Sequence, residues 1–334
     1  MSNAGAPLVS VLMPVRDGGA WLRAAVESIY AQSFTRFELL LVDDGSTDAA
    51  IVQLPCDPRL RIAPNRGTGI VDALNTAVSL ARAPLLARMD ADDIALPDRL
   101  AKQHAYLLAN PGVAICGGEV EIFRTDGPLA AGYDAYQSWV NALRNPSRIA
   151  REMFVESPLP HPTFFAATAV FRQLRYRDCA WAEDYDFLLR AYLAGLRMGK
   201  PTGVLLHWRD HQHRLTRASE RYSTHNFLRA KAWALSRLYP ERPMIICGTG
   251  RNAVRLHDAL AEHGISVTGF VEHAAARPRT SRRHLKVYDY TRLLAEHKDE
   301  LSVSAVSARG ARSELRALFL QHAMTEGRDF VMAG

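Results

Sequence analysis

The stretch LLARMDADDIALPDRL, residues 85–100, joins an apolar run to closely spaced aspartates and then to a helical pattern. Leu85–Met89 is typical of a buried strand, and Asp90, Asp92 and Asp93 follow it directly. Carboxylates at this density repel one another, so the turn is either well solvated or a site for a divalent cation. Taken alone, the stretch leaves both interpretations open.

The same order of strand, turn and helix recurs through the first 120 residues. Short apolar runs predict strands at Val9–Pro14, Phe37–Val42, Arg61–Ala63 and Leu85–Met89. Helical spacing of apolar residues predicts helices ending near Gln32, over 68–82 and over 97–110. Strands that alternate with helices predict an α/β fold with a doubly wound, mostly parallel sheet.

Two acidic clusters follow strands of this predicted sheet. Asp43-Asp44 comes after the second strand and Asp90–Asp93 after the fourth. Because the carboxyl ends of parallel strands share one edge, where ligands bind, we expect both clusters at one crevice. This co-location favours the metal site over the solvated turn. Oxygen ligands without nearby His or Cys favour Mg²⁺ or Mn²⁺, which would neutralise a leaving diphosphate.

Composition narrows the classes of protein. A chain of 334 residues fits two domains, and its 48% hydrophobic content is ordinary for a globular protein. Four widely spaced cysteines argue against zinc or a disulfide framework and for a reducing cytoplasm. The formal charge of +6 suits anionic partners but is too dispersed to predict nucleic-acid binding. We find no signal peptide and no apolar run long enough to span a membrane.

The blocks VSVLMPV, FELLLVDDGSTD, GTGIVDALNTAVSLA and ARMDADDIALPDRLAKQ occur in the order and at the spacing of a known family. Over residues 7–215 the chain resembles the family 2 glycosyltransferases, which have the GT-A fold. The resemblance implies inverting transfer of a sugar from a nucleoside diphosphate sugar, with a UDP-sugar favoured. The implied acceptor is a saccharide or lipid-linked saccharide, in cell-surface polysaccharide or lipopolysaccharide synthesis. The implied location is the cytoplasm, at or near the inner face of the membrane.

The resemblance also implies roles for individual residues. The predicted nucleotide-sugar-binding residues are Pro14, Val15, Arg16, Asp44, Asn65, Arg66, Asp90, His161 and Arg209. The predicted metal ligands are Asp92, Asp90 and His211. His161 comes from the block PHPTFF, and Arg209 and His211 come from HWRDHQHRL. Family members commonly carry Tyr-Asn after Pro-Val, whereas this chain carries Arg16-Asp17, so stacking of a base on that tyrosine is not expected.

The block WAEDYDFLLRA, residues 181–191, resembles the acidic acceptor motif of the family. An inverting transfer needs one base to take the proton of the acceptor hydroxyl, and a carboxylate suits that role. Glu183 and Asp184 point about 100° apart on a helix, so only one of them is expected to face the sugar. We predict that Asp184 is the base, because the family most often places it at the second acid.

The whole chain is predicted to form three parts. A catalytic domain covers residues 1–217, a helical linker covers 218–242, and a Rossmann-like domain covers 243–334. The linker helix, Ala218–Leu238, has a basic face, which leaves open a peripheral association with membranes; homo-oligomer formation is also open. In the last domain Gly248 and Gly250 follow a strand and open a helix, and Glu272 ends the next strand. This pattern predicts a second nucleotide site, with a vestigial or assembly module as the alternative.

Two rivals to a glycosyltransferase remain at this point. A sugar nucleotidylyltransferase also uses Mg²⁺ on a related sheet, but PVRDGGAW lacks the Gly-rich pattern that such an enzyme would need. A non-catalytic protein that binds nucleotide sugars would be favoured if Asp92 or Asp184 were dispensable.

Overall fold

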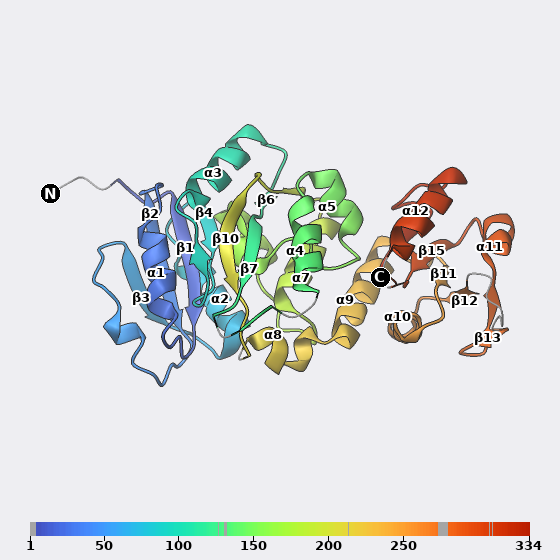
Figure 1. The fold of residues 1–334 in the computed structure, drawn as a ribbon, viewed down its shortest axis with the longest axis horizontal. Coiled ribbons are helices and arrows are strands. Elements are labelled where there is room, and N and C mark those ends of the chain that lie inside the picture. The colour runs from blue at the N-terminus through green and yellow to red at the C-terminus, as the bar shows by residue number, and fades with distance from the viewer. Residues whose placement is uncertain are drawn as a thin grey trace. The chain divides into compact units, whose positions relative to one another are not determined.

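The computed structural model describes residues 5–125, 127–129, 132–212, 214–272, 280–306, 308 and 310–334. The chain divides into two compact units (Figure 1). The N-terminal unit comprises Met1–Ala150, Pro158–Cys179 and Asp186–Ala218. The C-terminal unit comprises Arg151–Ser157, Ala180–Tyr185 and Ser219–Gly334. Two short segments from the middle of the sequence therefore belong to the C-terminal unit. The domains predicted from the sequence were continuous stretches of chain and did not include this exchange.

A seven-stranded sheet forms the centre of the N-terminal unit, in the order β3-β2-β1-β4-β8-β6-β9. Its parallel half consists of β1 (Val9–Val15), β2 (Phe37–Asp43), β3 (Leu60–Pro64) and β4 (Leu85–Arg88). Its other half consists of β8 (Phe165–Ala167), β6 (Ile115–Cys116) and β9 (Met198–Gly199), with β8 antiparallel to both β4 and β6. Every residue of β1 is buried, as expected for a strand covered on both faces. The predicted α/β fold with a mostly parallel sheet is confirmed.

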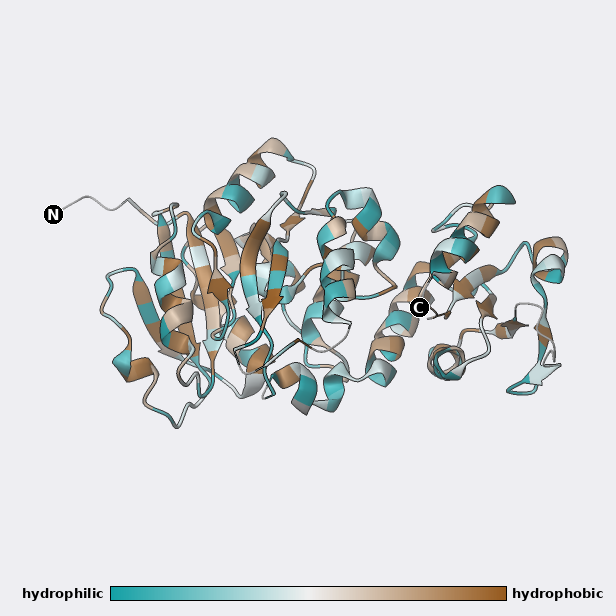
Figure 2. Cartoon of the chain, in the orientation of Figure 1, coloured by the Kyte–Doolittle hydropathy of each residue, from teal (hydrophilic) through white to brown (hydrophobic). Residues whose placement is uncertain are grey.

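Helices of the N-terminal unit pack their apolar stripes on this sheet. In α1 (Leu22–Tyr30) the buried residues Leu22, Ala25, Val26 and Ile29 recur at helical spacing. The other helices are α2 (Gly69–Leu80), α3 (Arg99–Ala109), α4 (Tyr133–Ala142), α5 (Pro146–Glu152), α6 (Thr168–Leu174), α7 (Glu183–Leu193) and α8 (Leu215–Ala218), some of which run into the C-terminal unit. Short 3-10 turns lie at Ile51–Gln53 (η1) and His161–Thr163 (η2). Figure 2 shows the central strands as hydrophobic and the outer helices as mixed, which locates the core at the sheet.

A second, three-stranded sheet positions the candidate site. It has the order β5-β10-β7, with β5 (Ile94–Ala95), β10 (Val204–Arg209) and β7 (Glu119–Phe123). The strands β5 and β10 pair antiparallel, with Ala95 opposite Leu206. Because β5 follows the acidic turn directly, this pairing brings the end of β10 to the three aspartates.

The C-terminal unit contains a six-stranded sheet in the order β13-β14-β12-β11-β15-β16. Its strands are β11 (Met244–Cys247), β12 (Val267–Val271), β13 (Ser281–Arg282), β14 (Leu285–Tyr288), β15 (Leu301–Ser304) and β16 (Phe330–Met332). All its neighbours pair in parallel except β13 with β14. The helices are α9 (Thr224–Leu238), α10 (Arg251–Glu262), α11 (Tyr290–Glu296) and α12 (Ala311–Gln321), preceded by the 3-10 turn η3 (Glu220–Tyr222).

The single helix predicted over 218–238 is wrong at its start. Helix α9 begins only at Thr224, because Ser223 caps it by accepting a hydrogen bond from the backbone N–H of Asn226. Its basic residues are engaged inside the unit: Lys231 Nζ donates to the carbonyl of Val155, and Arg229 pairs with Glu262. Of the basic residues on this helix, Lys231 is thus buried, whereas Arg229 and Arg237 stay at the surface.

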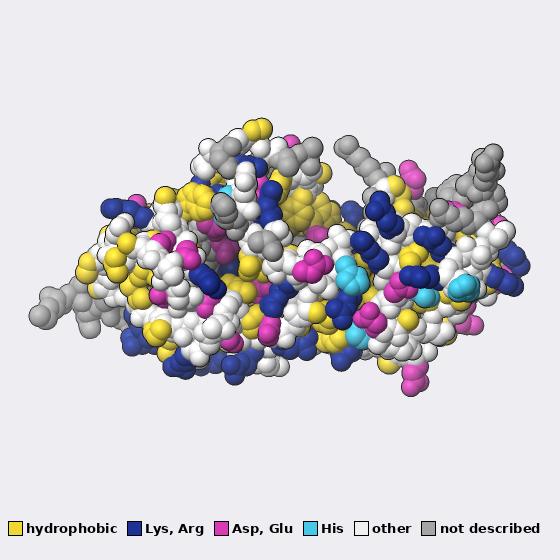
Figure 3. All heavy atoms as spheres, turned by 90° about the horizontal axis from the view of Figure 1, so that it is seen from below, with side chains coloured by type: hydrophobic (Ala, Val, Ile, Leu, Met, Phe, Trp, Pro, Cys, Tyr) yellow, Lys and Arg dark blue, Asp and Glu magenta, His cyan; other side chains and the backbone are white. Residues whose placement is uncertain are grey.

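On the face drawn in Figure 3, Lys and Arg side chains are scattered among acidic ones and do not form one continuous stripe. Within the described part of the chain, no helix combines the length and apolar character needed to cross a membrane.

Candidate metal and nucleotide-sugar site

Three carboxylates gather where β4 ends. One oxygen each of Asp90, Asp92 and Asp93 lies within 4.8 Å of the others. Asp93 is fully buried, and its Oδ1 accepts a hydrogen bond from the backbone N–H of Arg209 at 2.8 Å. Its Oδ2 is also buried and has no hydrogen-bond partner among the described residues. A buried carboxylate oxygen without a donor is costly unless a cation satisfies it.

Arginine and histidine side chains surround the cluster. Arg88, almost fully buried, pairs with Asp90, and His211 Nε2 lies 2.7 Å from Asp92 Oδ2. Arg209 donates from Nε to the carbonyl oxygen of Asp92 at 2.7 Å. The structure therefore brings Arg209 and His211 to the acidic turn, across more than 110 residues of sequence.

The carboxylates differ in their electrostatic environment. Burial, and then the charges of Asp92 and Asp90, raise the pKa of Asp93 well above its ordinary value. Burial also raises the pKa of Asp90, against the opposing charge of Arg88. Burial alone would raise the pKa of Asp92 too, but the hydrogen bond with His211 and the charge of Arg214 hold it below its ordinary value.

These residues fit a divalent cation. Asp90 and Asp92 offer partly exposed carboxylates, Asp93 adds an oxygen that lacks a donor, and His211 lies beside them. Carboxylate oxygens with at most one imidazole suit Mg²⁺ or Mn²⁺ rather than a thiolate-seeking metal.

Trp21, which the sequence analysis did not single out, forms a wall of this site. Its ring centroid lies 4.3 Å from that of His211, and the guanidinium carbon of Arg209 lies 5.5 Å from the same ring. The same guanidinium carbon of Arg209 lies 4.5 Å from the ring centroid of Phe123. Two aromatic rings thus fix the Arg209 side chain. The signal available in the sequence was an aromatic residue in the loop after the first strand.

The loops after β1 and β2 are tied together by Asp17. This residue has φ of 50°, a left-handed conformation that Asp and Asn tolerate better than most residues. Its carboxylate accepts from the backbone N–H of Thr47 at 2.7 Å, and its own N–H donates to Ser46 Oγ. Arg16, beside it, is exposed. The Asp at this position thus has a structural role in joining the two loops.

Asp44 and Asn65, both predicted nucleotide-binding residues, are in direct contact. Asn65 Nδ2 donates to Asp44 Oδ1 at 2.7 Å, and the backbone N–H of Gly69 donates to both oxygens of Asp44 at 2.9 and 3.0 Å. Arg66 lies exposed on the same loop, whereas Pro14 is buried at the end of β1.

His161 lies in η2 and is buried. Its Nε2 lies 2.9 Å from the hydroxyl of Tyr176. Burial, with the charge of Arg88, lowers the pKa of His161 well below its ordinary value, so the ring is neutral at physiological pH. A neutral imidazole can orient a hydroxyl but does not supply a positive charge to phosphate.

The predicted base and its neighbour lie in the C-terminal unit, at the start of α7. Glu183 is buried, and its Oε2 accepts a hydrogen bond from the hydroxyl of Tyr222 at 2.7 Å. The guanidinium of Arg221 approaches the same oxygen at 4.0 Å. Asp184 is partly exposed, and its Oδ1 accepts from the backbone N–H of Tyr185 at 2.7 Å.

The glycine loop of the C-terminal unit follows β11 as predicted. Gly248 has φ of 117°, and Gly250 directly precedes α10. Thr249, between them, donates from its hydroxyl to Glu272 Oε1 at 2.5 Å. Glu272, expected to receive a ribose hydroxyl, is therefore engaged by the loop itself; the second nucleotide site remains a prediction.

Comparison with known proteins identifies the class. A sequence model described as Glycosyl transferase family 2 matches residues 10–174. An uncharacterized glycosyltransferase of Haemophilus influenzae is 30% identical over 210 residues, which cover 60% of this chain and 75% of that protein. Another uncharacterized glycosyltransferase of H. influenzae is 29% identical over 191 residues, 54% of this chain, and the match spans only 59% of it. The O-antigen biosynthesis glycosyltransferase WbnJ of Escherichia coli is 27% identical over 214 residues, 61% of this chain and 80% of WbnJ.

Among solved structures, S. aureus TarS 1-349 in complex with UDP-GlcNAc is similar with a TM-score of 0.53 and 19% identity. The likeness covers 77% of this chain and 73% of that one, and it shows a shared GT-A fold. The chain belongs to glycosyl transferase family 2. The family and the enzyme class expected from the sequence, a glycosyltransferase, are thereby confirmed.

Proposed function

We propose that the chain transfers a sugar, with inversion, from a nucleoside diphosphate sugar to a hydroxyl of a saccharide or lipid-linked saccharide. The observation that carries the proposal is the acidic turn after β4, with the unsatisfied oxygen of Asp93 and His211 on Asp92. A UDP-sugar is favoured as donor, since the similar TarS structure is described as a complex with UDP-GlcNAc. The name of WbnJ, an O-antigen biosynthesis glycosyltransferase, supports a place in cell-surface polysaccharide or lipopolysaccharide synthesis. A cytoplasmic location is part of the same proposal.

Asp90, Asp92 and His211 would hold Mg²⁺ or Mn²⁺. A cation bound there supplies positive charge to the leaving diphosphate. Arg209, whose guanidinium lies near the rings of Trp21 and Phe123, suits phosphate oxygens. The remaining donor contacts would come from the end of β1 and from the loops after β1, β2 and β3. Their residues are Pro14, Val15, Arg16, Asp44, Asn65 and Arg66.

Asp184 would act as the base. The acceptor oxygen attacks the anomeric carbon, its proton passes to the Asp184 carboxylate, and the bond to the diphosphate breaks as the nucleotide leaves. One displacement at the anomeric carbon inverts its configuration. Asp184 is partly exposed whereas Glu183 is buried, which supports assigning the base to the second acid.

The experiment that tests the proposal is calorimetric titration of UDP with and without Mn²⁺. Asp92→Asn keeps the size of the side chain and a hydrogen-bonding oxygen for His211 but removes the charge, so we expect Mn²⁺-dependent binding to be lost. The matched control is Asp98→Asn, an exposed aspartate six residues later whose carboxylate accepts from Ser33 Oγ. Equal UDP affinity in Asp92→Asn and wild type, with and without Mn²⁺, would refute the metal assignment.

A further inference from the structure

The hydroxyl of Tyr222 donates a hydrogen bond to Glu183, the first acid of the pair at the start of α7. We propose that Tyr222 is a positioning residue: it fixes Glu183 so that Asp184 alone presents its carboxylate to the acceptor hydroxyl. The proposal rests on the proposed function, since it assigns the base to Asp184. Tyr222 lies outside the segment that the family model matches, 10–174, and 39 residues after Glu183.

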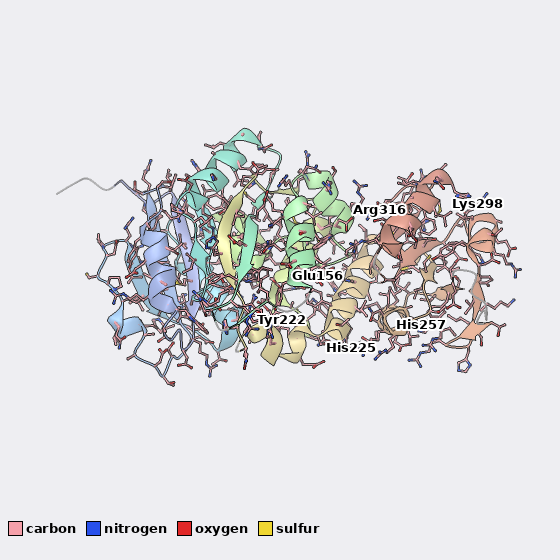
Figure 4. The ribbon with its side chains drawn as sticks, viewed as in Figure 1. Glu156, Tyr222, His225, His257, Lys298 and Arg316 are labelled. Carbon is pink, nitrogen blue, oxygen red and sulfur yellow. The ribbon has the colours of Figure 1, made fainter. Side chains whose placement is uncertain are left out.

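Tyr222 is held rigidly in a short turn. It ends the 3-10 turn η3, and Ser219 caps this turn by accepting a hydrogen bond from the N–H of Arg221. Asn226, in the first turn of α9, donates from its side chain to the carbonyl of Glu220 at 2.9 Å. Figure 4 shows Tyr222 on the connection that enters α9. The turn that carries Tyr222 is therefore tied by hydrogen bonds of the residues on both sides of it.

The direction of the hydrogen bond is fixed by charge. Burial, and then the negative charges of Glu183 and Asp184, raise the pKa of Tyr222 far above its ordinary value. Its hydroxyl therefore stays protonated and can only donate to the Glu183 carboxylate. A hydrogen bond from a hydroxyl to a carboxylate is among the stronger kinds in proteins.

Two neighbouring carboxylates are thereby given different roles. Glu183 is buried with Oε2 held by Tyr222 at 2.7 Å and approached by Arg221 at 4.0 Å. It cannot turn toward a substrate without breaking the contact. Asp184 is the more exposed of the two and lies one residue later on the same helix. Because Glu183 and Asp184 are adjacent on α7, loss of this contact would loosen the start of the helix that carries Asp184.

Mutation of Tyr222 removes the hydrogen bond whether it positions Asp184 or only stabilises the fold. The test must therefore distinguish these two roles. Tyr222→Phe deletes the hydroxyl and keeps the ring, and Glu183→Ala deletes the acceptor. Glu183→Gln keeps an oxygen that can accept from Tyr222. The matched control is Tyr239→Phe, because Tyr239 lies in the same unit and donates its hydroxyl to the carbonyl of Gly327 at 2.7 Å.

The measurements are kcat, donor KM and UDP affinity for each variant and for the Tyr222→Phe, Glu183→Ala double variant. We expect each single deletion to lower kcat by about 10- to 100-fold, the range for a displaced catalytic group, with donor KM and UDP affinity unchanged. The double variant should be no slower than the slower single one, because both remove the same contact. Glu183→Gln should retain more activity than Glu183→Ala, and Tyr239→Phe should match wild type.

Three outcomes would overturn the proposal. Full turnover in a Tyr222→Phe variant means that the contact positions nothing. Multiplying effects in the double variant mean that the two residues act separately. Equal falls in kcat and UDP affinity, or a matching loss in Tyr239→Phe, mean a general loss of structure. A folded wild-type chain that neither binds nor turns over any nucleoside diphosphate sugar instead refutes the proposed function itself.

Discussion

Arg316 offers a sharp test of how the C-terminal unit is held together. From α12 its Nη2 donates to Glu152 Oε1 at 2.8 Å and to Glu326 Oε1 at 2.8 Å, and its Nε donates to Glu326 Oε2 at 2.9 Å. The side chains of Arg316, Glu152 and Glu326 are only 16%, 11% and 12% exposed. Through Glu152, the Arg316 guanidinium helps to tie the segment Arg151–Ser157 to α12.

Arg316→Ala leaves two nearly buried carboxylates without this partner. Arg312 and Arg151 stay within 3.9 Å of these carboxylates, so the charges are not left wholly uncompensated. The cost is then that of hydrogen bonds to charged groups, about 1.5–3 kcal/mol. We expect a loss of that size in the free energy of unfolding. The control is Arg328→Ala in the same unit: Arg328 pairs with Asp329 but is 69% exposed, so its loss should cost less than about 1 kcal/mol.

Urea unfolding of wild type and both variants measures the difference. The free energy of unfolding of Arg316→Lys should lie between those of wild type and Arg316→Ala. The lysine ammonium keeps the positive charge but lacks the planar guanidinium that reaches both glutamates. Equal midpoints for Arg316→Ala and Arg328→Ala would show that the buried network stabilises the unit no more than a surface pair, and would refute the reasoning.

Two further predictions concern the base and a buried lysine. Asp184→Asn should lower turnover by about 10²–10⁴-fold with donor KM nearly unchanged, and Glu183→Gln should be milder; the reverse result in steady-state kinetics would exchange the two roles. Burial lowers the pKa of Lys200 from 10.5 to about 7. The unfolded chain therefore binds more protons at this residue between these pH values, and the free energy of unfolding should rise with pH across this window. Lys200→Met should show a shallower rise in urea unfolding; parallel profiles for the two chains would contradict the assignment.

The fold was predictable because its strands and helices carry strong local patterns. Strand β1 is buried at every position, so it appears in the sequence as an apolar run. Helix α1 repeats its apolar residues at helical spacing. Both patterns can be recognised in a single sequence. The start of α9 was not predictable from periodicity, because Ser223 acts through a single capping hydrogen bond.

Much less of the site followed from the residues alone. The acidic turn was visible as a cluster, and its place at a strand end followed from the α/β pattern. The approach of Arg209 and His211 depends on the pairing of β10 with β5, more than 110 residues apart, which no local pattern encodes. Only the resemblance to a family suggested it. The contact of Tyr222 with Glu183 is of the same kind, and so is the packing of Trp21 on His211.

The hydrogen bonds of Asp17 have a consequence for engineering donor preference. Asp17, in the loop after β1, forms hydrogen bonds with Thr47 and Ser46 in the loop after β2. The conformations of the two loops therefore depend on each other. Replacing Arg16 and Asp17 alone would remove the acceptor of the Thr47 N–H. Replacing the loop after β2 alone would remove the donor to the Asp17 carboxylate. Loop exchange with a relative should therefore transfer both segments together, and substitutions in one loop should be tolerated only with compensating changes in the other.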